Sequence, residues 1–206
     1  MFHVVDHPCV KAKLTILRDR ATGSKQFREC VEEITAFIAY EALKNLEVET
    51  VPVETPIASA TGYRIRNDVV IVPILRAGMG MLDGLLRLVP AAKVGFVGLE
   101  RDHETKLPHE YYCKLPAAGP DSVAVVVDPM LATGGSLAAA IDLLKREGFR
   151  QILVLAIVSS PEGRDAIEAT SPEVKVYTGS LDAGLNENKY IVPGLGDAGD
   201  RIYGTL

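Results

Sequence analysis

The sequence predicts an α/β fold, a mainly parallel twisted sheet flanked by helices. Apolar runs alternate with helical stretches from residue 69 onward, and such alternation gives right-handed crossovers between parallel strands. The run at residues 69–75 is continuous and rich in β-branched side chains, which is typical of a strand covered on both faces. The chain has 206 residues, enough for one sizeable core. We therefore expect a single domain over residues 1–206.

The expected elements follow in chain order. Apolar side chains recur at helical spacing over residues 24–46, with Ser24 available as N-cap, so this segment should be a long amphipathic helix. Val48, Val51 and Val53 indicate a short extended piece over residues 48–53. Gly148 is expected to end one later helix, and Ser160 followed by proline to start another. The remaining predicted strands cover residues 69–75, 93–99, 123–127, 152–158 and 174–177, and the remaining helices cover residues 79–88 and 135–147.

One connection is longer than compact domains normally contain. Residues 100–122 fit no helix and include three prolines and a glycine. Because Glu100 and Arg101 follow a predicted strand, the connection begins at the carboxyl edge of the sheet, where a loop can close over a ligand. Two interpretations stay open: a lid over a site, or a solvated excursion or plain β-hairpin. The histidines of this connection, His103 and His109, lack metal-ligand spacing and are expected to be solvated.

Composition and charge argue against several classes of protein. Lys and Arg number 22 against 27 Asp and Glu, a formal net charge of −5, so neither nucleic acid nor an anionic membrane is expected as a partner. The longest apolar run, residues 152–158, is far shorter than the roughly 20 residues that cross a membrane. The N-terminus has no secretory signal, and the three cysteines are widely separated without CxxC spacing. We expect a cytoplasmic protein with free thiols.

The most informative segment is residues 123–136, which has the pattern of a strand, an acid, a tight loop and a helix start. The sequence Thr-Gly-Gly-Ser at 133–136 would present backbone N–H groups and two hydroxyls at a helix N-terminus, where a phosphate is favoured. Asp128 at the strand end would then accept hydrogen bonds from neutral groups such as sugar hydroxyls. Taken alone, the segment could also be a plain βα turn with a helix cap. No lysine precedes Ser136, which argues against a nucleotide-kinase phosphate loop.

Two further segments can contribute to the same site. Arg76 follows a predicted strand in a glycine-containing loop and could offer a fork of donors to an anion, the alternative being a surface arginine on a soft turn. Residues 194–199 match GxGxxG, but only seven residues follow, too few for a dinucleotide-binding unit. We interpret that match as bent backbone that lines a pocket. Since carboxyl ends of parallel strands meet at one edge, Arg76, Arg101 and Asp128 should lie together.

These segments resemble those of a known family, the uracil phosphoribosyltransferases, over essentially the whole chain. The matching stretches are Pro-Ile-Leu-Arg-Ala-Gly at 73–78, Val-Asp-Pro-Met-Leu-Ala-Thr-Gly-Gly-Ser at 127–136, and residues 184–187 and 190–200. The resemblance implies a type I phosphoribosyltransferase-like fold with a small hood from the terminal segments and a long flexible loop. It also implies a pentosyltransferase of pyrimidine salvage, which makes UMP from uracil and 5-phospho-α-D-ribose 1-diphosphate (PRPP) and releases diphosphate.

The resemblance implies a function for each matching residue. Arg76, Arg101 and Asp128 would be the catalytic residues, with the arginines on the diphosphate and the acid on the ribose hydroxyls. The PRPP-binding set would be completed by Pro129, Met130, Leu131, Ala132, Thr133, Gly134, Gly135, Ser136 and Asp197. Magnesium would be carried on PRPP, near Asp197, rather than held directly by the protein. Uracil would be bound by Ile191, Gly196, Asp197 and Ala198, largely through backbone groups, and Tyr190 would either wall the ring or lie in the core.

One departure from the wider superfamily narrows the assignment. Many phosphoribosyltransferases carry a second acid where this chain has Pro129, and the uracil enzymes share the proline, so the function of that second acid is not transferred. The resemblance also raises GTP as an effector and a homodimer or homotetramer as the assembly. Two rival functions remain at this stage: a phosphoribosyltransferase for another base, and a PRPP-sensing regulator that binds RNA or a partner protein.

Overall fold

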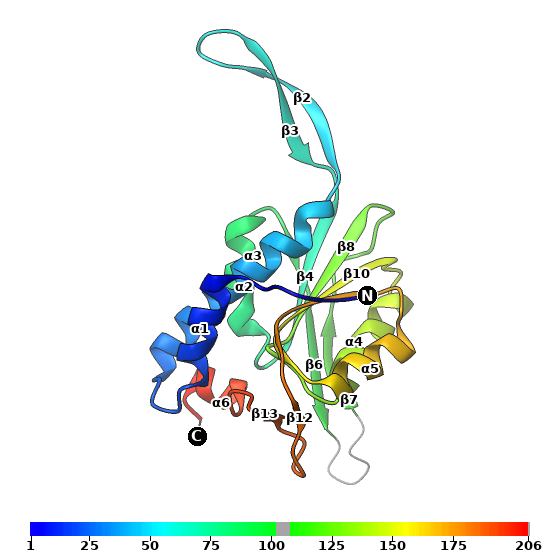
Figure 1. Ribbon diagram of the computed structural model, residues 1–206. Coiled ribbons are helices and arrows are strands. Elements are labelled where there is room, and N and C mark those ends of the chain that lie inside the picture. The colour runs from blue at the N-terminus through cyan, green and yellow to red at the C-terminus, as the bar shows by residue number, and fades with distance from the viewer. Residues whose placement is uncertain (102–107, 206) are drawn as a thin grey trace.

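The structure, a computed structural model, describes residues 1–101 and 108–205, and its centre is a twisted sheet (Figure 1). The strands of this sheet are β1 (Phe2–Val4), β4 (Asp68–Leu75), β5 (Lys93–Val94), β6 (Phe96–Arg101), β7 (Pro108–Lys114), β8 (Ser122–Val127), β9 (Met130–Leu131), β10 (Gln151–Ser159) and β11 (Lys175–Leu181). Their order is β1-β11-β10-β8-β4-β6-β7, with β5 beside β4 and β9 beside β10. The β6–β7 pair is antiparallel, and the other described pairs of this sheet are parallel.

Helices cover both faces of the sheet. They are α1 (Pro8–Arg18), α2 (Ser24–Ala42), α3 (Met79–Leu88), α4 (Gly135–Arg146), α5 (Pro161–Thr170) and α6 (Ala198–Tyr203). Alternate residues of β4 face opposite cores: Val69 and Ile71 pack with α1, α2 and α3, whereas Val70 and Val72 pack with α4 and α5. Burial on both sides explains why this strand is apolar at every position after Asp68. No described helix combines the length and the apolar character that a bilayer span requires.

Most of the predicted elements are confirmed, and one capping prediction is wrong. The helix α3 covers the predicted residues, and α2 ends four residues before the predicted end, where a 3-10 turn continues the chain. Ser24 does not cap α2, because Gly23 occupies the N-cap position with extended backbone and Ser24 is already helical. Ser160 does cap α5: its Oγ accepts a hydrogen bond from the N–H of Gly163 at 3.0 Å. Gly148 follows α4 with a φ of 92°, as a C-terminal cap requires.

Two hairpins add to the predicted elements. The predicted extended piece at 48–53 is β2 (Val48–Glu54), and it pairs with a strand that the sequence analysis missed, β3 (Ser59–Ile65). Together they form an arm that leaves the amino edge of the sheet and extends away from the body (Figure 1). In the 100–122 connection, β7 pairs back onto β6, so the hairpin interpretation is confirmed for that part. Residues 102–107, including His103 and the tip of the expected flexible loop, lie outside the described residues.

The terminal segments pack together at the carboxyl edge of the sheet and form the expected hood. The last strands there, β12 (Gly184–Leu185) and β13 (Ile191–Val192), make a small antiparallel pair. Arg201 of α6 donates hydrogen bonds from Nη1 to the carbonyl of Leu195 at 2.8 Å and from Nη2 to the carbonyl of Asp19 at 2.6 Å. Its guanidinium also lies 4.4 Å from the ring centre of Phe27. The N- and C-terminal parts of the chain are thereby joined over one end of the sheet.

Candidate active site

Three strand ends place the predicted catalytic residues at one edge of the sheet. The strand β4 lies between β8 and β6 and runs parallel to both, so the three carboxyl ends meet. Arg76 directly follows β4, Asp128 directly follows β8, and Arg101 is the last residue of β6. This edge is where ligands bind in open parallel sheets. The placement of Arg101 is that of its backbone, and its contact with a diphosphate stays a prediction.

The loop after β8 surrounds a small cavity at the start of α4. The cavity measures about 40 Å³ and is lined by Asp128 and by residues 130–137. The residue before the helix, Gly134, has a φ of 81°, and a Cβ there would lie 2.9 Å from the Cβ of Ala166, so only glycine fits. The first N–H groups of an α-helix have no acceptor within the helix, and the helix dipole makes this end positive. The cavity has the size and polarity of a site for one phosphate group.

The Arg76 loop lies beside this phosphate loop. Arg76 follows a cis peptide bond with Leu75. A Cβ on Gly78 would lie 2.4 Å from the carbonyl oxygen of Val127, so the loop packs directly onto the end of β8, next to Asp128. The carbonyl of Arg76 accepts a hydrogen bond from the hydroxyl of Tyr203 at 2.9 Å. Backbone contact on one side and a tyrosine on the other therefore fix the base of the Arg76 side chain.

The guanidinium of Arg76 faces acidic side chains of the C-terminal segment. Its Nη2 lies 3.3 Å from Oδ1 of Asp200, with 59% of the Arg76 side chain exposed. Hydrogen bonds from Thr205 and from Arg76 lower the pKa of Asp200. An exposed pair of this kind contributes little to stability. Asp200 therefore orients Arg76 with an interaction that an incoming diphosphate can replace.

Asp128 and Asp197 are close enough to influence each other. Asp197 caps α6 by accepting a hydrogen bond from the N–H of Asp200 at 2.9 Å, and a Cβ on Gly199 would touch both Asp197 Oδ1 and Arg76 Nη2, at 3.3 and 3.7 Å. Burial of the Asp128 carboxyl raises its pKa, the N–H of Met130 opposes the rise and the charge of Asp197 adds to it, with a net result of about 7. The free site therefore holds a carboxyl that titrates near neutral pH.

A larger cavity opens between the Arg76 loop and the C-terminal segment. It measures about 420 Å³, and its lining includes Arg76, Glu100, Tyr111 and Asp197. Asp128 lines the small phosphate-sized cavity, and its carboxyl is influenced by Asp197 of the larger one. The two hollows thus adjoin at this pair of acids, and together they offer one extended site with a positive arginine at its rim.

The residues predicted to bind the base lie in one bent segment, which we call the 191–198 segment. Ile191 and Ala198 are buried at its two ends, and Gly196 has a φ of 82°. Pro193 follows a cis peptide bond. Tyr190, just before the segment, is 46% exposed, so the interpretation of this residue as a core tyrosine is wrong.

Several residues at the site carried no assigned function in the sequence analysis. Asp200 belongs to the stretch at 190–200 that resembles the family, so the sequence contains a signal that could have identified it. No local sequence pattern identifies Tyr203 or Tyr111 as residues of the site. His109 is exposed, with Nδ1 3.7 Å from Glu100 Oε1, as expected for a solvated residue. Within the described ranges, no three His, Cys, Asp or Glu side chains are grouped as a metal site.

Comparison with families of known proteins covers almost the entire chain. A family model described as uracil phosphoribosyltransferase matches residues 4–205. A uracil phosphoribosyltransferase of Thermoanaerobacter sp. is 53% identical over 98% of this chain and 97% of its own length. Another, from Listeria welshimeri, is 52% identical over 98% of each chain.

Solved structures agree with the fold. The AQ2163 protein of Aquifex aeolicus is 38% identical and superimposes with a TM-score of 0.94 over 98% of each chain. An adenine phosphoribosyltransferase of Trypanosoma brucei is 13% identical, with a TM-score of 0.59 over 94% of this chain and 86% of that one. The similarity to the Trypanosoma brucei enzyme concerns the fold alone, and this fold is that of the type I phosphoribosyltransferases.

Proposed function

Because the chain belongs to the uracil phosphoribosyltransferase family, we propose that the carboxyl edge of its sheet is where uracil and PRPP react to give UMP and diphosphate. The chain is a pentosyltransferase of pyrimidine salvage, and its substrates are uracil and PRPP. One observation carries the assignment to this edge: the loop at 128–136, Arg76 and the 191–198 segment meet there, although they are far apart in the sequence.

PRPP is proposed to lie across the two adjoining cavities. The 5-phosphate occupies the small cavity at the start of α4, where residues 132–136 surround it with backbone N–H groups. The ribose hydroxyls face Asp128, which can accept or donate a hydrogen bond because its pKa is near 7. The diphosphate lies toward Arg76, with Arg101 as the second donor. The support is the order of these groups along the edge, which matches the order of phosphate, sugar and diphosphate in PRPP.

Uracil is proposed to bind against the 191–198 segment. The base has an N–H donor between two carbonyl acceptors, and backbone C=O and N–H groups offer the complementary pattern without a side-chain charge. Ile191 and residues 196–198 carry such groups on either side of a sharp bend. Tyr190 is exposed beside them and is proposed to cover one face of the ring.

The chemistry is electrostatic and positional. As diphosphate leaves the anomeric carbon, negative charge grows on the leaving group and positive charge on the ribose. Fixed donors such as Arg76 stabilise the negative charge on the leaving diphosphate. Alignment of the uracil nitrogen with the anomeric carbon supplies much of the remaining acceleration. No protein nucleophile is required, because the nitrogen of uracil bonds directly to the anomeric carbon. It gives up its proton to the surroundings as the bond from that carbon to the diphosphate oxygen breaks.

Magnesium is proposed to enter with PRPP. The carboxylates of Asp128 and Asp197 are hard oxygen ligands that lie near each other, and Mg²⁺ in proteins is commonly held by one or two carboxylates together with substrate phosphates. The ion would neutralise part of the diphosphate charge. Asp197 is the residue of this pair that would approach it.

A purified-protein assay for diphosphate release tests the proposal. With Mg²⁺ and PRPP present, release should require uracil and should yield UMP in equal amount. Competition among uracil, cytosine, orotate and hypoxanthine addresses specificity: turnover of another base in preference to uracil would contradict the proposal. Filter binding of RNA at low and physiological salt tests the regulator alternative, which needs salt-resistant binding.

The assembly is proposed to be a homodimer or homotetramer, supported by the β2–β3 arm. A two-stranded hairpin alone is only marginally stable in water, yet this arm exposes apolar side chains, with Ile57 96% and Tyr63 69% accessible. A second copy of the chain would cover them.

Replacing Ile57 and Tyr63 together with aspartate is expected to shift the protein toward monomers in sedimentation velocity, since charges oppose burial of the arm. The double replacement of Lys25 and Glu29 with alanine, on the exposed face of α2, serves as control and should leave the assembly unchanged. A parent protein that sediments as a monomer at all concentrations would contradict the proposed assembly.

GTP is proposed as an effector on the basis of the family resemblance. Adding GTP to the assay at subsaturating PRPP should increase the rate of UMP formation. Equal rates with GTP and with ATP would argue against a specific effector.

A further inference from the structure

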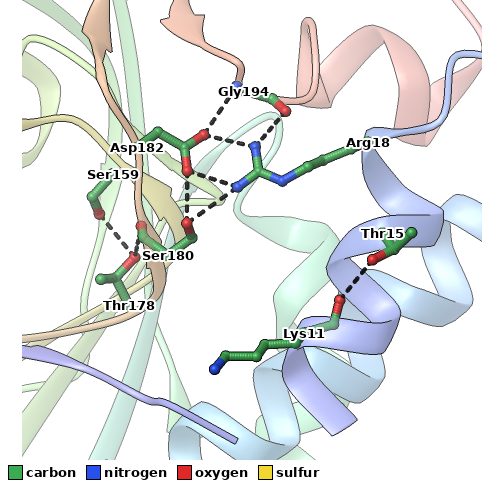
Figure 2. Close-up of polar contacts among 8 residues, drawn as sticks. All are labelled: Lys11, Thr15, Arg18, Ser159, Thr178, Ser180, Asp182 and Gly194. Carbon is green, nitrogen blue, oxygen red and sulfur yellow. Dashed lines mark hydrogen bonds and ion pairs between the residues drawn. The ribbon is translucent and has the colours of Figure 1, made fainter. Parts of the chain in front are cut away.

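The 191–198 segment is held from behind by an ion pair to which the sequence analysis assigned no function. Arg18, the last residue of α1, faces Asp182, which lies between β11 and β12 (Figure 2). Nη2 of Arg18 is 2.6 Å from Oδ1 of Asp182, and Nη1 is 2.7 Å from Oδ2. Burial acts to raise the pKa of Asp182, but hydrogen bonds from Arg18 and Ser180 outweigh it and hold the pKa below its ordinary value. The pair is therefore charged, bidentate and directional.

Both members of the pair also bind Gly194. The N–H of Gly194 donates to Oδ2 of Asp182 at 2.9 Å, and the carbonyl of Gly194 accepts from Nη1 of Arg18 at 2.7 Å (Figure 2). Gly194 has a φ of 57°, and a Cβ on it would lie 2.2 Å from the carbonyl oxygen of Ile191. Gly194 thus sits directly against Ile191 and two residues before Gly196, so fixing its polar groups fixes the bend between them.

The hydroxyl group of Ser180 also holds the Asp182 carboxylate. Ser180 Oγ donates to Asp182 Oδ1 at 2.6 Å and accepts from Arg18 Nη2 at 3.1 Å. The backbone of Ser180 is fixed in turn, because its carbonyl accepts from Thr178 Oγ1, which accepts from Ser159 Oγ (Figure 2). The ends of β10 and β11 therefore anchor the pair to the sheet.

We propose that Arg18 and Asp182 are positioning residues for uracil: together they hold Gly194 so that the backbone groups of Ile191 and of residues 196–198 keep the spacing that the base requires. The inference rests on the proposed function, which places uracil on that segment. Neither side chain is assigned a contact with substrate, and both act through the Gly194 backbone. Most of the PRPP contacts are assigned to the 128–136 loop and to Arg76. Asp197 is the one residue of the 191–198 segment assigned to both substrates, and its carboxylate has a separate hold, the hydrogen bond from the N–H of Asp200 at 2.9 Å.

Replacing Arg18 with methionine or Asp182 with asparagine is expected to raise the KM for uracil about 10- to 100-fold, because small displacements of binding groups are costly. The KM for PRPP should stay within a factor of about two. Arg87→Met is the matched control, since Arg87 pairs with Glu32 at the far end of α3, with Nη2 2.6 Å from Oε1. Ser180→Ala keeps the ion pair, so it should fold readily and shift the uracil KM in the same direction by less. All constants are measured well below each variant's melting temperature.

The outcomes separate positioning from plain stabilisation. A lowered melting temperature with an unchanged uracil KM would overturn the proposal, and so would an equal rise in both KM values. Hydrogen exchange of the 191–198 amides gives a readout that does not depend on turnover: it should be faster in Arg18→Met than in the parent and unchanged in Arg87→Met. If the parent makes no UMP, the proposed function fails, and the positioning inference fails with it. If the parent makes UMP and the exchange of these amides is unchanged in Arg18→Met, the positioning inference alone is overturned.

Discussion

Asp128→Asn is expected to lower UMP synthesis about 10²- to 10³-fold, as the loss of one preorganised polar group at a reacting centre often does. The asparagine keeps the shape of the side chain but cannot take the negative charge that favours hydrogen bonds from the ribose hydroxyls. Steady-state kinetics with saturating uracil and PRPP, together with circular dichroism, measure the loss in a folded protein. Turnover equal to that of the parent would remove Asp128 from the catalytic residues.

The same variant should be more stable than the parent at pH 8. In the folded protein the pKa of Asp128 is about 7, whereas an unfolded aspartate titrates near 3.9. Between these values the native state binds more protons than the unfolded state, so stability falls as pH rises from about 4 to about 7 and is then constant. Asparagine cannot ionise, so the variant does not lose this stability. Its free energy of unfolding should exceed that of the parent by up to about 4 kcal/mol at pH 8 and by little at pH 4.

Urea unfolding of parent and variant at both pH values measures the difference. Asp142→Asn, on the exposed face of α4, is the control and should follow the parent. A stability difference that is the same at pH 4 and pH 8 would contradict the raised pKa. If the difference appears, the site keeps Asp128 at a cost to the fold.

Arg76→Ala is expected to lower kcat about 10²- to 10³-fold, because it removes a fixed cation from the departing diphosphate. The change in stability should be small, since the Arg76 side chain is 59% exposed and its pair with Asp200 is weak. Rapid-quench measurement of a single turnover places the loss in the chemical step. Arg76→Lys should recover part of the rate, because it restores the charge but not the fork of donors.

Arg87→Ala serves as the control for this series. It removes an arginine of similar exposure, 74%, at the far end of α3, and its kcat should match that of the parent. A single-turnover rate for Arg76→Ala equal to that of this control would show that the diphosphate is stabilised elsewhere.

The sheet and its helices could be predicted because their signals are local. The β4 strand is apolar at nearly every position, since both faces are buried, and α3 follows it with apolar residues at helical spacing. The arm was only half predicted. Among the described residues, the two strands of this hairpin pack mainly on each other, so the hairpin needs no regular apolar face, and β3 contains Ser59, Gly62 and Arg64.

The residues of the site, like the elements of the fold, include some that a local sequence pattern predicts and some that it does not. Asp128, Arg76 and the glycine-containing loops each follow a recognisable strand, so their meeting at one edge followed from the parallel topology. The pair of Arg18 and Asp182 joins residues 164 positions apart. Each of the two looks like a surface residue in its own stretch, and no pattern within a single sequence connects them.

The contacts between the N- and C-terminal parts of the chain have a consequence for the synthesis of the protein. The sheet draws its strands from residues 2 to 181, so all of them are synthesised before the 191–198 segment and α6. Gly194 and Arg201 emerge only afterwards and must then find Arg18 and Asp19, which were made first. A prematurely released polypeptide would therefore retain the groove for the sugar phosphate but lack the wall against which the nucleobase is aligned.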